Sequence, residues 1–208
     1  MRFLGLLRKA ETTAEPDDGA PSTQAASDHF YTGMELARRG LYDEAIKELK
    51  QAAREQPHSA ETYFNLGLIY QGTNRSAEAI KAYKQAVSAA PDHFEAFNNL
   101  GLAYAGQSNY IEAMKAYKQA IRLKPDYAEA YNNLGINYYN FGRYPEALKA
   151  CKKALEIAPD YHQVHYSLGL IYIDLKEKPL AVGEYEILEA VDEDMARQLQ
   201  VEIYKAFR

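Results

Sequence analysis

The sequence predicts an all-α solenoid, and a period of 34 residues is the observation that predicts it. Four prolines, Pro57, Pro91, Pro125 and Pro159, stand 34 residues apart, and the residues around them recur in the same places. A fixed period of this size is typical of stacked supersecondary units. We number the repeat positions from a start 31 residues before each proline, so that the proline stands at position 32.

Small residues recur at three positions of the predicted unit. Position 8 carries Gly33, Gly67, Gly101, Gly135 and Gly169. Position 20 carries Ala45, Ala79, Ala113, Ala147 and Ala181. Position 27 carries Ala52, Ala86, Ala120, Ala154 and then Leu188. Position 24 carries Leu49, Tyr83, Tyr117, Cys151 and Tyr185, all of them large except Cys151. Spacings of three and four place these residues on one face of each of two helices that cross closely, and the proline ends the second helix.

These residues resemble the tetratricopeptide repeat, a helix-turn-helix unit of the same period. The resemblance implies a right-handed α-solenoid of five helical hairpins, at about 26–59, 60–93, 94–127, 128–161 and 162–195 within a repeat domain of 27–195. The central repeats match best, with Asn-Asn-Leu-Gly at 98–101 and again at 132–135. The outer repeats depart from the pattern, since His29 and Thr32 occupy positions 4 and 7 and Glu193 replaces the last proline. Atypical end repeats are expected in a solenoid.

The two ends of the chain predict different elements. Residues 194–208 predict a capping helix, because Met195, Leu199 and Ile203 follow each other at a spacing of four and would cover the last apolar face. Residues 1–26 predict a flexible segment, because they carry no apolar period.

Within that segment, residues 1–9 combine Arg2, Arg8 and Lys9 with four large apolar residues. Three interpretations stay open: a disordered terminus, a short basic helix that contacts a membrane surface or a partner, and a segment that folds back into the groove of the array.

Composition is that of an ordinary, mildly acidic chain, with a net charge of -5 and 47% hydrophobic residues. No apolar run approaches the roughly 20 residues of a transmembrane helix. We therefore expect a cytoplasmic protein, with peripheral membrane association through residues 1–9 left open. The single cysteine, Cys151, occupies position 24 and is expected to pack as a small hydrophobe.

The resemblance places the ligand-binding concave face on the first helices, at positions 2, 5, 6, 9, 12 and 13. Position 6 carries Asn65, Asn99 and Asn133, and asparagine can bond a peptide backbone through donors and an acceptor. Such a row is similar to the one in the repeat arrays of O-linked N-acetylglucosamine transferases. The predicted peptide-binding residues are Tyr31, Phe64, Asn65, Asn98, Asn99, Asn132, Asn133, Tyr139 and Tyr166. The alternative is that the amides join neighbouring repeats or solvate the helices, and that the aromatic rings pack on the adjacent repeat.

The same positions indicate the kind of partner. Chaperone-binding members of the family hold a terminal carboxylate with basic residues, whereas position 2 here carries Glu61, Glu95 and Glu129. A carboxylate clamp for a chaperone tail is therefore not expected, and the ligand should be neutral or basic with apolar anchors. Asp92 with Glu95, and Asp126 with Glu129, also have the form of a helix-capping pair.

The second helices predict a basic outer stripe at positions 22 and 25. Its lysines are Lys47, Lys50, Lys81, Lys84, Lys115, Lys118, Lys149 and Lys152. A glutamate stands three residues before the first lysine of each pair, so we expect solvated ion pairs. Nucleic acid is not an expected partner.

Nothing in the sequence predicts catalysis. The five histidines form no His-x-x-x-His pair, and no phosphate-binding loop or nucleophile elbow is present. We expect no enzymatic activity, no metal site and no cofactor. The predicted function is a non-enzymatic protein–protein interaction module or scaffold that binds an extended or helical peptide in its concave groove. The alternative is a self-associating or complex-bridging scaffold. One form of this alternative has residues 1–9 recruit the protein to a membrane surface. The oligomeric state and the partner stay open.

Overall fold

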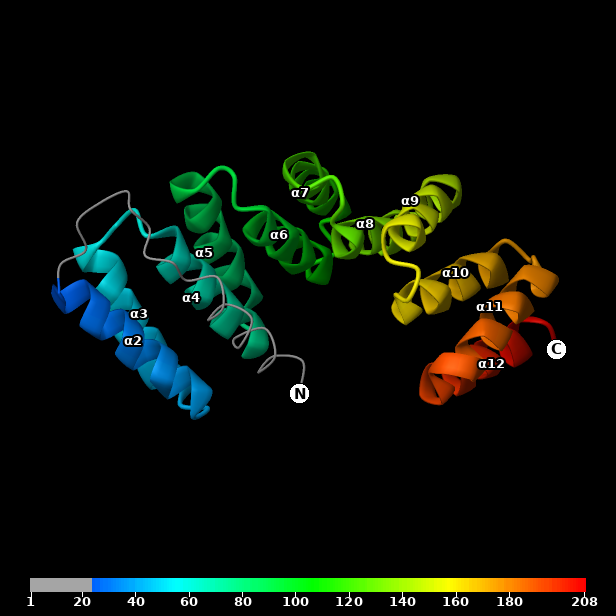
Figure 1. Ribbon diagram of the computed structural model, residues 1–208, viewed down its shortest axis with the longest axis horizontal. Helices are drawn as coiled ribbons and strands as arrows, with labels where there is room; N and C mark the ends of the chain where they lie inside the picture. Colours follow the sequence, from blue (N-terminus) through cyan, green and yellow to red (C-terminus); the bar gives the residue numbers. More distant parts are fainter. Residues whose placement is uncertain (1–23) are drawn as a thin grey trace. The chain divides into compact units, whose positions relative to one another are not determined.

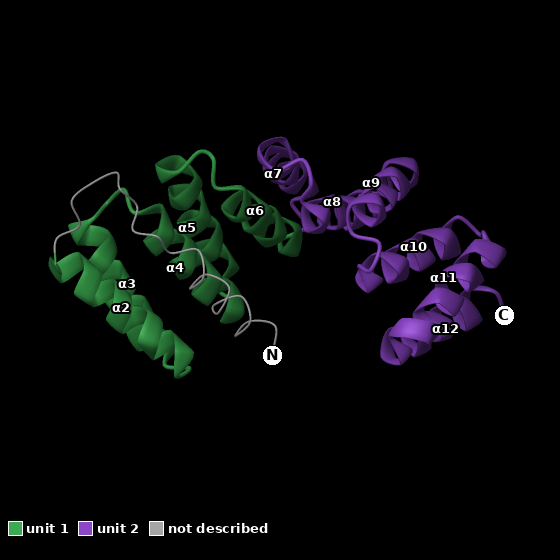
Figure 2. Ribbon diagram, viewed as in Figure 1, with its two compact units in different colours: residues 1–107 green, residues 108–208 purple. Residues whose placement is uncertain are grey.

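The computed structural model describes residues 24–208, all of whose regular elements are helices (Figure 1). The interpretations of residues 1–9 concern a segment outside this range. The chain divides into two compact units, residues 1–107 and 108–208 (Figure 2), and each unit is described by itself. The described part of unit 1 comprises α2 (Gln24–Arg38), α3 (Tyr42–Glu55), α4 (Ala60–Gly72), α5 (Ser76–Ala89) and α6 (Phe94–Gly106). Unit 2 comprises α7 (Tyr110–Leu123), α8 (Ala128–Asn140), α9 (Tyr144–Ile157), α10 (His162–Asp174), α11 (Lys178–Val191) and α12 (Glu193–Ala206).

The helices pack as the period predicts. Contacting hairpins are formed by α2 with α3 and α4 with α5 in unit 1, and by α8 with α9 and α10 with α11 in unit 2. Helix α2 begins at Gln24, two residues before the predicted start of the first repeat. Helix α12 packs on both α10 and α11, with Leu199 fully buried and Ile203 8% exposed.

The turn between the two helices of each repeat has one constant feature, a positive φ at position 15. The residues are Gly40, Asn74, Ser108, Gly142 and Lys176, with φ of 79°, 59°, 57°, 77° and 64°. Glycine and asparagine tolerate this left-handed conformation, whereas serine and lysine are strained by it. The geometry of the turn is therefore kept although the residue type varies.

The glycine at position 8 sets how closely the paired helices approach. A Cβ at Gly33 would lie 2.8 Å from the Leu49 side chain, and one at Gly135 would lie 2.5 Å from Cys151 Sγ. Gly67 has the same relation to the ring of Tyr83. The partner stands at position 24 each time, and its side chain fills the space that a Cβ on the glycine would occupy.

The fifth repeat closes differently. The nearest side chain to Gly169 is Leu199 of α12, 2.5 Å from the site of a Cβ, rather than Tyr185 at position 24. Tyr185 is half-buried and donates its hydroxyl to Glu189 over 2.5 Å. The capping helix therefore supplies the side chain against the glycine that the second helix supplies in repeats 1, 2 and 4.

The expected capping pairs are wrong. The N-cap of α6 is His93, whose Nδ1 accepts from the Ala96 amide over 3.4 Å, and the N-cap of α8 is Tyr127, without a side-chain cap. Both caps lie one residue after the predicted aspartate. In repeat 2 this place is held by Ser59, which accepts from Thr62 N. Hence Asp92 and Asp126 do not start the helices.

The outer lysines have two roles rather than one. Lys115 pairs with Glu112 over 2.6 Å as expected, but Glu78 and Glu146 pair with Arg75 and Arg143 instead. In the first three pairs the second lysine covers a tyrosine ring of the following repeat. The distances from Nζ to the ring centroid are 5.9 Å for Lys50 and Tyr70, 5.6 Å for Lys84 and Tyr104, and 5.8 Å for Lys118 and Tyr138. These cation–π contacts stabilise the junction between successive repeats.

Burial raises the pKa of the Cys151 thiol to about 12, and the nearby Glu184 carboxylate adds to the effect. The side chain is fully buried against the backbone of Gly135. Its thiolate population is therefore very small at neutral pH. In the part of the chain that the structure describes, no helix has the length and apolar character needed to cross a bilayer.

Substitution of Gly135 tests the close crossing. Gly135→Ala should lower the free energy of unfolding by about 1–3 kcal/mol, because the new Cβ overlaps Cys151. The matched control is Gly183→Ala in α11, where a Cβ would meet no atom within 4 Å, so this change should stabilise by about 0.5–1 kcal/mol. Guanidinium denaturation followed by circular dichroism measures both. Equal effects of the two substitutions would contradict the proposed crossing.

The Cys151 thiol should react with Ellman's reagent at pH 8 only after unfolding, because it is buried and protonated. As a control, Ser88→Cys in a Cys151→Ala background places a thiol at an exposed position of α5 and should react within the mixing time. Native Cys151 reacting at the rate of the control thiol would show that the α8–α9 crossing opens readily.

Candidate functional site: the faces of the first helices

The predicted amide row lies deeper in unit 1 than a surface ladder would. The side chains of Asn65 and Asn98 are fully buried, and Asn99 is 5% exposed. Asn65 Nδ2 donates to the Glu61 carbonyl over 2.9 Å, and Asn99 Nδ2 donates to the Glu95 carbonyl over 3.0 Å. Both bonds run back one turn within the same helix, a local geometry available to asparagine. The amide nitrogens at position 6 are thus engaged by their own helices.

The acceptor end of Asn65 is different. Its Oδ1 is buried and makes no hydrogen bond within residues 24–208, and the same holds for Asn137 Oδ1. Asn137 uses its Nδ2 to hold the Tyr110 carbonyl over 2.9 Å, which attaches the start of α7 to α8. Since buried acceptors almost always have partners, these two oxygens are the unsatisfied ends of the amides.

The aromatic members in unit 1 fall into two environments. Tyr31 is 68% exposed, and its ring meets Phe30 edge-on at 5.6 Å between centroids. Phe64 is half-buried and packs on Tyr83 at 6.0 Å and on His93 at 4.7 Å. Tyr31 therefore presents its ring to solvent, whereas Phe64 contributes largely to packing.

In unit 2 the amides connect helices. Asn132 is 4% exposed, and its Oδ1 accepts from the Ser167 hydroxyl over 3.2 Å. This bond joins position 5 of α8 to position 6 of α10. Asn133 is half-buried and is the most accessible of the three asparagines at position 6.

A tyrosine cluster stands beside these amides. The pKa of Tyr139 is raised, first by burial and then by the interaction of its hydroxyl with the nearby Asp174 carboxylate. Tyr166 lies close enough to add to the shift, and the Tyr144 ring is 5.9 Å from that of Tyr139. We define the α8–α10 face by the residues Asn133, Ile136, Tyr139, Tyr166 and Asp174.

The α8–α10 face combines apolar surface with one negative charge. Ile136 is 38% exposed, Tyr139 and Tyr166 are half-buried, and Asp174 is exposed. Asp174 was not among the predicted residues. It occupies position 13, which the resemblance already assigns to the concave face, so reading that position across the repeats would have identified it.

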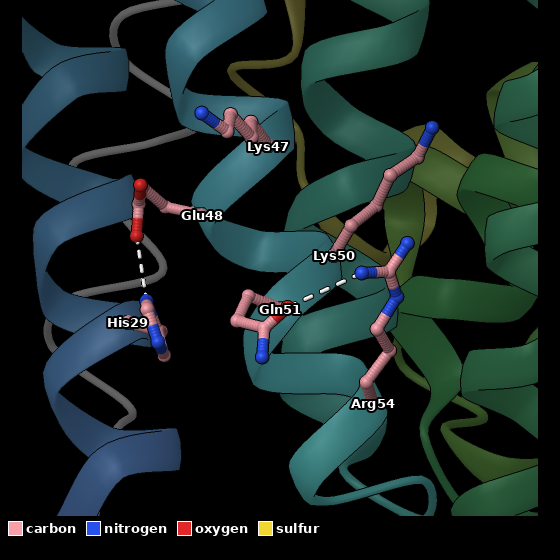
Figure 3. A pocket seen from close by; sticks show the side chains of 6 residues that line it. All are labelled: His29, Lys47, Glu48, Lys50, Gln51 and Arg54. Carbon is pink, nitrogen blue, oxygen red and sulfur yellow. Dashed lines mark hydrogen bonds and ion pairs between the residues drawn. The ribbon is translucent and has the colours of Figure 1, made fainter.

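A polar depression of about 430 Å³ lies elsewhere, on the α2–α3 hairpin (Figure 3). Its lining residues are His29, Lys47, Glu48, Lys50, Gln51 and Arg54. His29 comes from the first helix and the others from the second, so the depression does not coincide with the predicted peptide-binding residues. Figure 3 shows His29 bonded to Glu48, at 2.6 Å, on one side of it.

That histidine–glutamate pair recurs at the other end of the array. His165 Nδ1 lies 2.7 Å from Glu184 Oε2, with the two side chains 13% and 14% exposed. Both pairs join position 4 to position 23. The three central repeats carry Tyr63, Phe97 or Tyr131 at position 4 and a buried alanine at position 23. The terminal repeats therefore exchange an aromatic–alanine combination for a polar pair.

A comparison with protein-family profiles agrees with this architecture of short helical hairpins. The sequence profile of the tetratricopeptide repeat matches residues 32–93, 70–128, 98–162 and 132–195. The chain belongs to the tetratricopeptide repeat family, a class of protein-interaction scaffolds.

Solved structures show the same fold. MamA residues 41-end from Desulfovibrio magneticus RS-1 is 20% identical, with a TM-score of 0.77 over 83% of this chain and 98% of that chain. A second MamA structure is 27% identical, with a TM-score of 0.66 over 84% and 93% of the two chains. TTC0263, a thermophilic tetratricopeptide repeat protein of Thermus thermophilus, is 23% identical, with a TM-score of 0.65 over 88% and 98%. A search among curated proteins gave no significant match.

The terminal pair can be tested by exchanging it for the central combination. Glu184→Ala should lower the free energy of unfolding by about 1–3 kcal/mol, because it leaves the buried His165 without its partner. The double substitution His165→Tyr with Glu184→Ala reproduces Tyr131 and Ala150 and should recover most of the loss. The denaturation midpoints of Glu184→Ala, of His165→Tyr and of the double variant give the coupling energy between the two positions. Additive effects would contradict a specific pair.

Proposed function

We propose that the chain binds an extended or helical peptide segment of a partner protein on the concave faces of its first helices, with the α8–α10 face as the principal contact. The observation that carries the proposal is the tyrosine cluster of Tyr139 and Tyr166 beside the exposed Ile136. Tyrosine supplies large contact area at little cost in conformational entropy and is enriched among the residues that dominate binding energy.

The charge of the face supports a choice of ligand. Asp174 is exposed and close enough to raise the pKa of Tyr139, so one carboxylate stands beside the aromatic rings. An acidic peptide would be repelled there, whereas a lysine or arginine would be attracted. The proposed ligand is neutral or basic and carries apolar anchors.

The amides have separate roles in this proposal. Asn133 is half-buried and is assigned the contact with the peptide backbone, because a side chain must be accessible to reach a ligand. Asn65, Asn98, Asn99 and Asn132 are buried and are assigned the support of the helices that present the site. Tyr31, at 68% exposure, is a second candidate anchor on unit 1.

A peptide selected against the full chain by phage display tests the site. Tyr139→Ala combined with Tyr166→Ala should weaken its binding by about tenfold or more, about 1.4 kcal/mol, as measured by isothermal titration calorimetry. Asn133→Ala should weaken it less. The control is Ile111→Ala, which removes a 54% exposed apolar side chain from α7. Unchanged affinity of the double variant, with unchanged circular dichroism, would remove the α8–α10 face from the mechanism.

A further inference from the structure

Helix α11 departs from the second helices of the other repeats on its outer face. Positions 19, 22 and 26 read Glu-Lys-Gln in the first three repeats and Glu-Lys-Lys in the fourth. In α11 the same positions are Leu180, Gly183 and Ile187. Leu180 is 49% exposed, Ile187 is 45% exposed, and Val191, one turn further, is 49% exposed. We call Leu180, Gly183, Ile187 and Val191 the α11 stripe.

The neighbours of α11 pack on its other sides. Ala181 and Leu188 are fully buried, and Glu184 is bonded to His165 of α10. The Tyr185 hydroxyl accepts from Gln200 of α12 over 3.2 Å. A Cβ at Gly183 would meet nothing within 4 Å. The stripe, about 16 Å long at the helical rise, is therefore left uncovered by both helices, and an exposed apolar stripe of this kind marks an interaction site.

The charges around the stripe indicate what covers it. Residues 177–194 contain seven carboxylates against one lysine, Lys178, so the stripe lies in strongly acidic surroundings. Two copies of α11 placed face to face would bring these like charges together, which opposes a symmetric α11–α11 contact. A fitting occupant is apolar and basic.

One segment of the chain itself has that chemistry. Residues 1–9 contain Phe3, Leu4, Leu6 and Leu7 together with Arg2, Arg8 and Lys9, and the first acidic residue is Glu11. Fourteen residues, 10–23, connect this segment to the start of α2 at Gln24.

We propose that residues 1–9 of one copy dock on the α11 stripe of a second copy. The segment is basic and the surroundings of the stripe are acidic, which favours their pairing, and a second copy supplies the segment whatever the arrangement of the repeats within one chain. A head-to-tail contact of this kind gives a ring where its rotation closes and an open-ended chain of copies where it does not. The α11 stripe lies on a second helix, so this contact is independent of peptide binding at the α8–α10 face.

The test measures the segment and the stripe separately. The binding probe is a fluorescein-labelled synthetic peptide of residues 1–9, titrated by anisotropy against the chain lacking residues 2–9. The stripe variant is Leu180→Glu, Gly183→Lys and Ile187→Gln, which installs the residues of the first three repeats. The matched control is Val201→Gln with Tyr204→Gln, which removes exposed apolar side chains, 50% and 62% exposed, from α12. Light scattering of the full chain and of each variant is measured over a hundredfold range of concentration.

The peptide should bind the shortened chain and the α12 control with equal affinity. It should bind the stripe variant at least tenfold more weakly. Its affinity for the shortened chain should be lower in 0.5 M than in 0.05 M salt. The mass of the full chain should rise with concentration, whereas the shortened chain and the stripe variant should stay monomeric. Absence of peptide binding, or equal binding to the stripe variant, would overturn the docking site. Peptide binding by a full chain that stays monomeric throughout would overturn the second copy as the source of the segment.

Discussion

The contact between a glycine at position 8 and the side chain that fills the space of its missing Cβ is the interaction on which the repeat depends. At Gly33 and Gly135, the Cβ site lies 3.2 Å from the Ala45 carbonyl and 3.3 Å from the Ala147 carbonyl, so backbone as well as side chain limits the space. The proline and the left-handed turn residue decide where the helices end, but this crossing decides how closely they pack. In the fifth repeat the glycine is kept while its partner comes from α12. The capping helix is therefore part of the last crossing and not merely a cover over it.

Much of this architecture could be predicted because close crossings demand particular sizes. Glycine and alanine at fixed positions identify paired helices whatever residues stand on the exposed faces of those helices. The predicted helices are present from α2 to α12. The helix starts were harder, because capping depends on the dihedral angles of one residue. His93 and Tyr127 take that place, one residue beyond the aspartates that carry the sequence signal. The left-handed turn was also hidden, since Ser108 and Lys176 adopt an angle that their residue types do not favour.

For the candidate site, the sequence indicated which residues align but not how deeply they lie. An asparagine on a helix can point to a ligand or turn back to the preceding carbonyl, and both fit the same spacing. Asn65 and Asn99 turn back, whereas Asn132 bonds across to Ser167. The difference follows their places on the helix, because Asn65 and Asn99 stand at position 6 and Asn132 stands at position 5, within reach of Ser167 of α10. Asp174 escaped notice for a related reason: its role depends on Tyr139 of the preceding repeat.

Departures from the period are of two physical kinds. At positions 4 and 23 the end repeats replace an aromatic residue and an alanine with histidine and glutamate, and each pair satisfies itself, as His165 and Glu184 do over 2.7 Å. Such a departure needs no partner, because its polar groups are already bonded. At positions 19 and 26 of α11, by contrast, polar or charged residues are replaced by Leu180 and Ile187, and nearly half of each residue is left in water. A departure that exposes apolar surface lowers the solubility of the end repeat without stabilising it, so its presence is explained when another segment covers it. The second kind is therefore the more informative guide to the contacts of a repeat protein.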